Sequence, residues 1–296
     1  MGNILTKQFY RQRKDFEDSC AERDAKLTFP EGVICSTDIA YADDGIKAHM
    51  LDIYRPEDSQ EKILPVIINV HGGGLIIGNK EFNRYFCALL CKKGFLVYSI
   101  EYRLIPDCLI YDQIADVFMA MDYIKERLAA DGGDLSHVYM AGDSGGACLI
   151  TYANAIQNST NIARAANVTP SGLRINALGL ISGMFYTSRF DKIGLFLPKY
   201  LYGRDYKKTS FAKYVNPENR ELLNSLAPVW LVTSHNDFLR RYTTDFEKAL
   251  TRAEREHELV AFPKNKKLTH AFSVFEPFLS ESSEVIDMMV KYFRKF

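Results

Sequence analysis

The chain has 296 residues, 47% hydrophobic and 25% charged, which is enough for one large globular domain with a buried core. Lysine plus arginine and aspartate plus glutamate number 37 each, so the formal net charge at pH 7 is zero. This balance argues against nucleic acid or an anionic membrane as a partner. The lack of an apolar run of about 18 residues argues against a transmembrane helix.

The first segment and the cysteines indicate a reducing compartment. Residues 1 to about 30 are charged from Lys7 onward and lack the apolar stretch of a secretory signal. The six cysteines form no C-x-x-C pair, and no cysteine–histidine cluster has metal-ligand spacing. We therefore expect a cytoplasmic protein with reduced thiols that uses no metal and no cofactor.

In chain order, the pattern begins with an amphipathic helical arm over residues 1 to about 30. Two short strands around the turn Asp43-Asp44-Gly45 then predict an antiparallel hairpin at a sheet edge. Six runs that are apolar on both faces follow, as is typical of parallel strands buried between helices. They are residues 64–70, 94–102, 137–142, 175–182, 228–234 and 257–262.

Helical patterns separate these strands, for example "EFNRYFCALLCKKG" and "YDQIADVFMAMDYIKERLAADGG". The alternation predicts an α/β protein with a mostly parallel central sheet flanked by helices. An aromatic-rich, irregular segment over residues 184 to about 226 does not fit the sheet. We expect one domain over residues 1–296 with a small cap.

The stretch "VYMAGDSGGACLI" contains the first chemical signal. GDSGG surrounds the nucleophilic serine of chymotrypsin-like double β-barrels, but G-x-S-x-G is also the nucleophile elbow of α/β-hydrolases. Here a strand enters Ser144 and a helix-compatible stretch leaves it, which favours the elbow. Gly142 and Gly146 would then be required because strand and helix approach each other closely. A turn without chemistry is the alternative.

A second glycine-rich stretch, "HGGG" at residues 71–74, follows the strand over residues 64–70. Its exposed backbone amides suit an oxyanion hole made by Gly72 and Gly73 together with Gly145. A nucleotide-binding loop would need G-x-G-x-x-G or a Lys-Ser/Thr pair, which are missing. Because only the amide of Gly145 is used, Gly145→Ala is expected to be tolerated and Gly146→Val is not.

The catalytic base should be a histidine beyond a strand of the sheet. His270 lies in the loop between the last strand-like run and the final helix, and His235 is its rival. Asp237, three residues past the preceding strand, is the candidate orienting acid. The order Ser144, Asp237, His270 differs from the His, Asp, Ser order of chymotrypsin-like proteases.

Together these motifs resemble the hormone-sensitive-lipase-like branch of the α/β-hydrolase superfamily. The resemblance rests on "HGGG", "EYRLIPD", "GDSGG", "NDFL" and "HAF", from about Leu64 to the C-terminus. It implies an α/β-hydrolase fold, carboxylic-ester hydrolysis, and a helical cap from residues of about 1–30 and 184–226. Gly145 departs from the usual alanine, and Phe238 from the usual proline.

The sequence therefore predicts a serine carboxylesterase for small or medium acyl esters, aromatic or sugar-linked ones included. An amidase or peptidase on the same triad is an alternative, because the residues do not reveal the leaving group. A non-catalytic ligand-binding protein of this fold is another. Its partner would be a small-molecule ester, and exposed edge strands would allow a homodimer.

Overall fold

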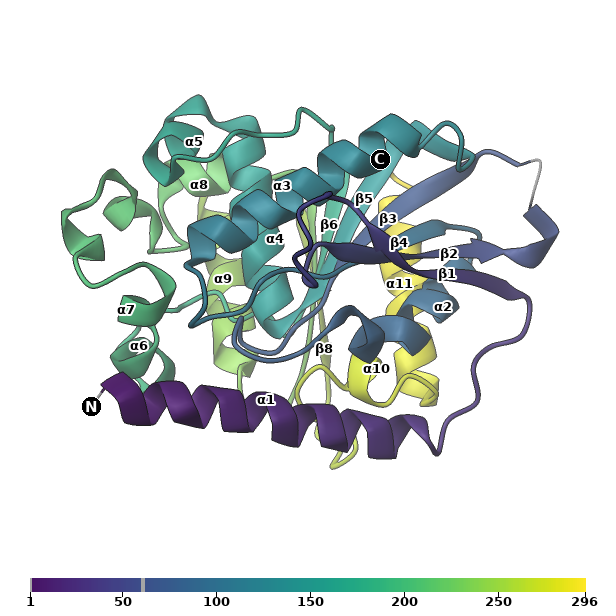
Figure 1. Cartoon of the computed structure of the whole chain (residues 1–296), viewed down its shortest axis with the longest axis horizontal. Coiled ribbons are helices and arrows are strands. Elements are labelled where there is room, and N and C mark those ends of the chain that lie inside the picture. Colours follow the sequence, from purple (N-terminus) through teal and green to yellow (C-terminus); the bar gives the residue numbers. More distant parts are fainter. Residues whose placement is uncertain (1, 60–61) are drawn as a thin grey trace.

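The computed structural model describes residues 2–59 and 62–296, which build one twisted eight-stranded sheet between two layers of helices (Figure 1). The strand order is β1-β2-β4-β3-β5-β6-β7-β8. Pairing is antiparallel for β1–β2 and β2–β4 and parallel for the rest, which confirms the predicted mostly parallel sheet with an edge hairpin. The strands are β1 (Val33–Ala40), β2 (Met50–Pro56), β3 (Leu64–Val70), β4 (Leu96–Ile100), β5 (Gly133–Asp143), β6 (Ala177–Ile181), β7 (Val229–Ser234) and β8 (His257–Phe262).

The central strands are apolar on both faces because each face contacts its own core. In β3, Ile68 belongs to one buried cluster and Ile67 to the other; in β4, Tyr98 and Val97 divide in the same way. Successive side chains of a strand point to opposite faces, so a strand buried on both sides has no polar alternation. This is why the predicted runs lie within about two residues of most observed strands.

The long helices cover the two faces of the sheet. α2 (Arg84–Cys91) and α11 (Ser280–Phe293) pack on one face. α3 (Ile110–Arg127), α4 (Ser144–Asn158), α5 (Thr160–Ala166) and α9 (Arg240–Arg252) pack on the other. None of the helices in the described ranges is long and apolar enough to cross a bilayer.

The cap segment, residues 184–226, folds into short helical pieces beside α4 and α9 (Figure 1). Its buried aromatic side chains pack onto the core: the Tyr202 hydroxyl lies 3.0 Å from that of Tyr152 in α4. Phe190, by contrast, is 91% exposed. The pieces are α6 (Lys192–Phe196), α7 (Pro198–Leu201), η3 (Tyr206–Lys208), η4 (Ser210–Tyr214) and α8 (Arg220–Asn224).

The first helix, α1 (Gly2–Asp24), runs along one side of the molecule from beside α6 to beyond α10 (Figure 1). Arg13 attaches this helix to the rest of the molecule: its guanidinium donates to the carbonyls of Ile76 (2.8 Å) and Ile105 (2.6 Å). The Phe9 ring packs edge-on against Tyr200 of the cap segment, with centroids 5.3 Å apart. Three further short helices lie elsewhere in the chain: η1 (Glu57–Ser59), η2 (Lys80–Asn83) and α10 (Phe272–Phe275).

Candidate active site

Ser144 lies at the point where β5 ends and α4 begins, and it has the left-handed φ of +50°. A non-glycine residue rarely adopts this conformation, and such strain is typical of a nucleophile elbow. A Cβ on Gly146 would lie 2.1 Å from the Val70 carbonyl oxygen and 2.5 Å from that of His71. This confirms the predicted need for glycine there.

His270 and Asp237 meet at the same edge of the sheet, in the loops that follow β8 and β7. Nδ1 of His270 lies 2.7 Å from Oδ1 of Asp237, so Nδ1–H donates to the carboxylate and Nε2 is left as a proton acceptor. Asp237 also accepts from the Thr233 hydroxyl (2.8 Å) and the Leu239 amide (2.8 Å). Burial alone would raise the pKa of Asp237, but the hydrogen bond and charge of His270 lower it.

The segment after β6 joins the serine to the histidine loop. The Met184 amide donates to the Ser144 carbonyl (2.9 Å), and the Ala271 amide donates to the Ser182 hydroxyl (3.1 Å). Within the described ranges no hydrogen bond links the Ser144 hydroxyl to His270; in free enzymes such bonds are often long and tighten with substrate. The three predicted residues therefore come from neighbouring loops tied to one short segment.

The rival base, His235, is held apart from this group. Its Nδ1 faces the Arg240 guanidinium at 3.0 Å on the protein surface. The remaining histidines also have acidic neighbours, so an adjacent acid alone does not identify the base. His49 contacts Asp44 and Asp116, His71 contacts Glu101, His137 contacts Asp134, and His257 contacts Glu247.

The glycine loop does not use its amides as predicted. The Gly72 amide donates to Oδ1 of Asp143 at 3.0 Å, so this hydrogen is already occupied. Gly73 and Gly74 have φ values of +99° and +61°, and no acceptor is recorded for their amides in residues 2–59 and 62–296. Gly74 therefore replaces Gly72 as a candidate oxyanion donor.

Gly145 approaches the same loop more closely than the sequence suggested. A Cβ built on Gly145 would lie 2.8 Å from the Leu75 nitrogen and 3.0 Å from the Gly74 nitrogen. Real Cβ atoms do not approach backbone atoms so closely, so an alanine would push the glycine loop away. This contact argues against the expectation that Gly145→Ala is tolerated, because the missing side chain matters as well as the amide.

The family of the chain follows from comparison with known proteins. A family model described as alpha/beta hydrolase fold matches residues 67–273, which is more than two thirds of the chain. The chain belongs to the α/β-hydrolase family. This confirms the resemblance inferred from the five motifs.

Individual relatives of this α/β-hydrolase match only part of the chain, at modest identity. A probable isoprenylcysteine alpha-carbonyl methylesterase of Oryza sativa subsp. japonica is 29% identical over 184 residues, which cover 58% of this chain and 44% of that protein. The chain thus spans less than half the length of the curated relatives it matches.

Esterase B of Lactobacillus Rhamnosis (HN001) has the same fold. Its crystal structure is 23% identical, with a TM-score of 0.92, and the match covers 100% of this chain and 96% of that chain. The same esterase inhibited by a C4-C4 SN3 tributyrin phosphonate matches with a TM-score of 0.93. At this identity the likeness establishes the fold alone.

His71 of this hydrolase is fully buried and donates from both ring nitrogens. Nδ1 lies 2.9 Å from the Gly72 carbonyl oxygen and Nε2 lies 2.9 Å from Oε1 of Glu101. An oxygen acceptor at each ring nitrogen favours the doubly protonated, cationic imidazole. Burial alone would lower the pKa of His71, but the charge and hydrogen bond of Glu101 raise it.

Asp143 is the candidate site residue that the motif analysis missed. Its buried Oδ1 accepts from the Gly72 amide and from Nδ2 of Asn83, both at 3.0 Å. Burial raises the pKa of Asp143. The hydrogen bond from Asn83 and the charge of His270 lower it, but the effect of burial is larger. Its place inside GDSGG was a signal, because the residue before the nucleophile necessarily lies beside the glycine loop.

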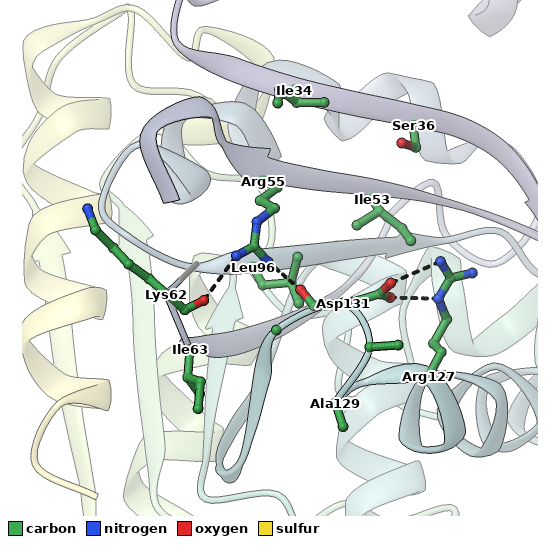
Figure 2. Close-up of a pocket in the computed structure, with 12 residues that line it drawn as sticks. Ile34, Ser36, Ile53, Arg55, Lys62, Ile63, Leu96, Arg127, Ala129 and Asp131 are labelled. Carbon is green, nitrogen blue, oxygen red and sulfur yellow. Dashed lines mark hydrogen bonds and ion pairs between the residues drawn. The ribbon is translucent and has the colours of Figure 1, made fainter. Parts of the chain in front are cut away.

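Two hollows in the surface differ in their relation to this site. One, of about 440 Å³, lies before β3 and β5 (Figure 2). Ser144 directly follows β5, at the other end of that strand. In this hollow, Arg127 and Asp131 form a two-bond ion pair (2.6 and 3.1 Å), and Arg55 donates to the Asp131 and Lys62 carbonyls. The other, of about 860 Å³, is lined by His270 itself. In the described ranges no cluster of three or more metal-ligating side chains occurs.

Proposed function

We propose that this α/β-hydrolase is a serine carboxylesterase that acts on esters of small or medium acyl groups. The observation that carries the proposal is the 2.7 Å contact of His270 with Asp237, on loops tied to the strained Ser144 elbow. The curated relative is named a probable methylesterase and the structural neighbour an esterase, which supports an ester as substrate.

The first half of the reaction forms an acyl-enzyme. Nε2 of His270 takes the Ser144 proton as the serine oxygen bonds to the ester carbonyl carbon, and Asp237 stabilises the resulting imidazolium. The amides of Gly73, Gly74 and Gly145 donate to the oxyanion, helped by the amino end of α4. The imidazolium then protonates the alcohol oxygen, the carbon–oxygen bond breaks, and the alcohol leaves.

The second half restores the enzyme. Water gives a proton to Nε2 of His270 and its oxygen attacks the acyl carbon; collapse releases the carboxylic acid and returns the proton to Ser144. The substrate is thus a small-molecule ester, and the chain's own groups perform every proton transfer. All six cysteines are free thiols, which fits the cytoplasmic location that we infer.

Replacement of the nucleophile tests the proposal. We predict that Ser144→Ala lowers kcat/KM for 4-nitrophenyl butanoate by at least about 1000-fold, because no other hydroxyl occupies the elbow. Ser136→Ala, at a serine on the surface, should change it by less than about twofold. A fluorophosphonate probe should add its mass to Ser144 in the wild type only.

The same assay separates the alternatives. Turnover by purified Ser144→Ala at the wild-type rate would overturn the triad. Equal kcat/KM on a matched ester and amide would favour an amidase. A folded wild type that neither turns over esters nor takes the probe would support a binding protein.

A further inference from the structure

The groove beside His270 is assembled from three segments that meet at the carboxyl edge of the sheet. They are the loop after β7, the loop between β8 and α10, and the turn between α10 and α11. Its volume of about 860 Å³ is in the usual range for a small-molecule site. Besides His270, the groove is lined by Phe238, Lys266, Lys267, Phe275, Glu276 and Leu279.

The position of His270 in the groove indicates which part of a substrate enters it. In the mechanism proposed above, on which this inference rests, His270 must reach the oxygen of the departing alcohol. The residues that line the groove include His270 but not Ser144 or the glycines that would hold the carbonyl oxygen. A groove that His270 lines and Ser144 does not suits the alcohol part of an ester better than the acyl part, which bonds to Ser144.

The walls of the groove combine apolar rings with unpaired positive charge. Phe238 is 73% exposed and its ring lies over that of His270, with centroids 4.3 Å apart. Lys266 and Lys267 form no ion pair with any residue in the described ranges, unlike Arg13, Arg103 and Arg127, which line other hollows. Glu276 is the one acid among the lining residues given for this groove.

Other charges near the two lysines do not cancel them. Glu281 lies close enough to Lys267 to feel its charge, and its carboxylate accepts from the Asn265 side chain at 3.2 Å. Lys264, in the same loop, adds a third cation outside the groove lining. An alcohol with an apolar body and an anionic group would match this surface, because the lysines attract the anion and the rings contact the body.

We propose that the groove selects esters whose alcohol part carries a carboxylate, with Lys266 and Lys267 as the specificity-determining residues. Hydrolysis of such an ester consumes one water and releases a carboxylic acid and a hydroxy acid. A neutral ester would react at the same triad without using the lysines.

Two chromogenic esters test this proposal: 4-nitrophenyl butanoate and its ring-carboxylated analogue, 5-butanoyloxy-2-nitrobenzoate. The readout is the ratio of kcat/KM for the carboxylated ester to that for the neutral ester, each corrected for its spontaneous hydrolysis. We expect the double variant Lys266→Glu/Lys267→Glu to lower this ratio by about tenfold or more at low salt, while the neutral ester changes by less than about twofold. Lys264→Glu, which makes one such charge reversal outside the groove lining, should alter the ratio by less than about twofold.

Two further measurements test the direction in which charge in the groove changes this ratio. Glu276→Gln should raise the ratio, because it removes the one negative wall residue. Raising ionic strength from about 0.02 to 0.5 M should lower the ratio in the wild type and raise it in the double variant, whose two glutamates repel the carboxylate. A ratio that is unchanged by the double variant, or lowered equally by Lys264→Glu, would overturn the groove assignment. Loss of turnover on both esters in the wild type would instead overturn the esterase proposal.

Discussion

Glu101 illustrates how one partly buried carboxylate can hold the glycine loop. Its Oε1 accepts from His71 at 2.9 Å and its Oε2 accepts from the Lys80 amide at 2.8 Å. His71 in turn donates to Gly72, the first glycine of the loop, and stacks on the Tyr102 ring with centroids 4.3 Å apart. The pair of a fully buried His71 and a partly buried Glu101 thus fixes the start of the segment that carries the candidate oxyanion donors.

The contact between His71 and Glu101 predicts that the free energy of unfolding depends on pH. The pKa of His71 is higher in the folded state than the ordinary histidine pKa of about 6.5. The charged His71 therefore stabilises the fold fully below about pH 6.5, and this stabilisation is lost as pH rises through the pKa of His71 in the folded protein. Glu101→Gln removes the counter-ion, so we expect its free energy of unfolding to fall below wild type by about 1–2 kcal/mol near pH 6.

Urea unfolding at pH 6, 7, 8 and 9 measures this effect, with Glu57→Gln in an exposed turn as the control. The difference between wild type and Glu101→Gln should shrink as pH rises. A difference that is the same at every pH would mean that His71 is neutral in the fold.

At the scale of elements, one arginine of α1 makes several hydrogen bonds to the carboxyl edge of the sheet. Arg13 donates to the carbonyls of Ile76, Leu104 and Ile105 and pairs with Asp107 at 2.8 Å. These carbonyls belong to the glycine loop and to the segment after β4. A helix with a strongly polar composition is thereby fixed by directed hydrogen bonds rather than by a wide apolar face.

Arg13→Ala should therefore weaken the attachment of α1. We expect the free energy of unfolding to fall by about 2 kcal/mol, because three backbone carbonyls lose a charged donor. Arg11→Ala is the matched control on the same helix: its side chain is 83% exposed and its 3.7 Å pair with Asp15 should contribute less than about 0.5 kcal/mol. Equal effects of the two variants in urea unfolding would show that Arg13 does not anchor α1.

For the whole molecule, the sheet ends in two strands, β1 and β8, that each pair on one side only. The register of β1 shifts between Ser36 and Ile39, and Asp38 has a φ of +56°. Such irregularity hinders pairing with another chain. β8 pairs in continuous register from His257 to Phe262, so the predicted homodimer would use β8. That dimer stays a prediction.

Zero net charge makes the molecule as a whole sensitive to pH. With 37 acidic and 37 basic side chains, mutual repulsion between copies is smallest near pH 7. We predict that light scattering at low salt shows the strongest self-attraction near pH 7 and less at pH 9. The mass at pH 9, where attraction is weaker, reports the oligomeric state. Self-attraction that increases steadily from pH 7 to pH 9 would contradict a charge-controlled origin.

The sequence by itself determined the sheet, the elbow at Ser144 and the order of Ser144, Asp237 and His270. These depend on local pattern: apolar runs, a strand–turn–helix transition, and loops that follow strands. Only the tertiary structure decided that Asp143 occupies the Gly72 amide, that Gly145 has no room for a Cβ, and that two lysines line a groove beside His270. Asp143 and Gly72 are 71 residues apart in the chain, so the motif that contains Asp143 does not by itself reveal the contact, which arises from the pairing of β3 with β5.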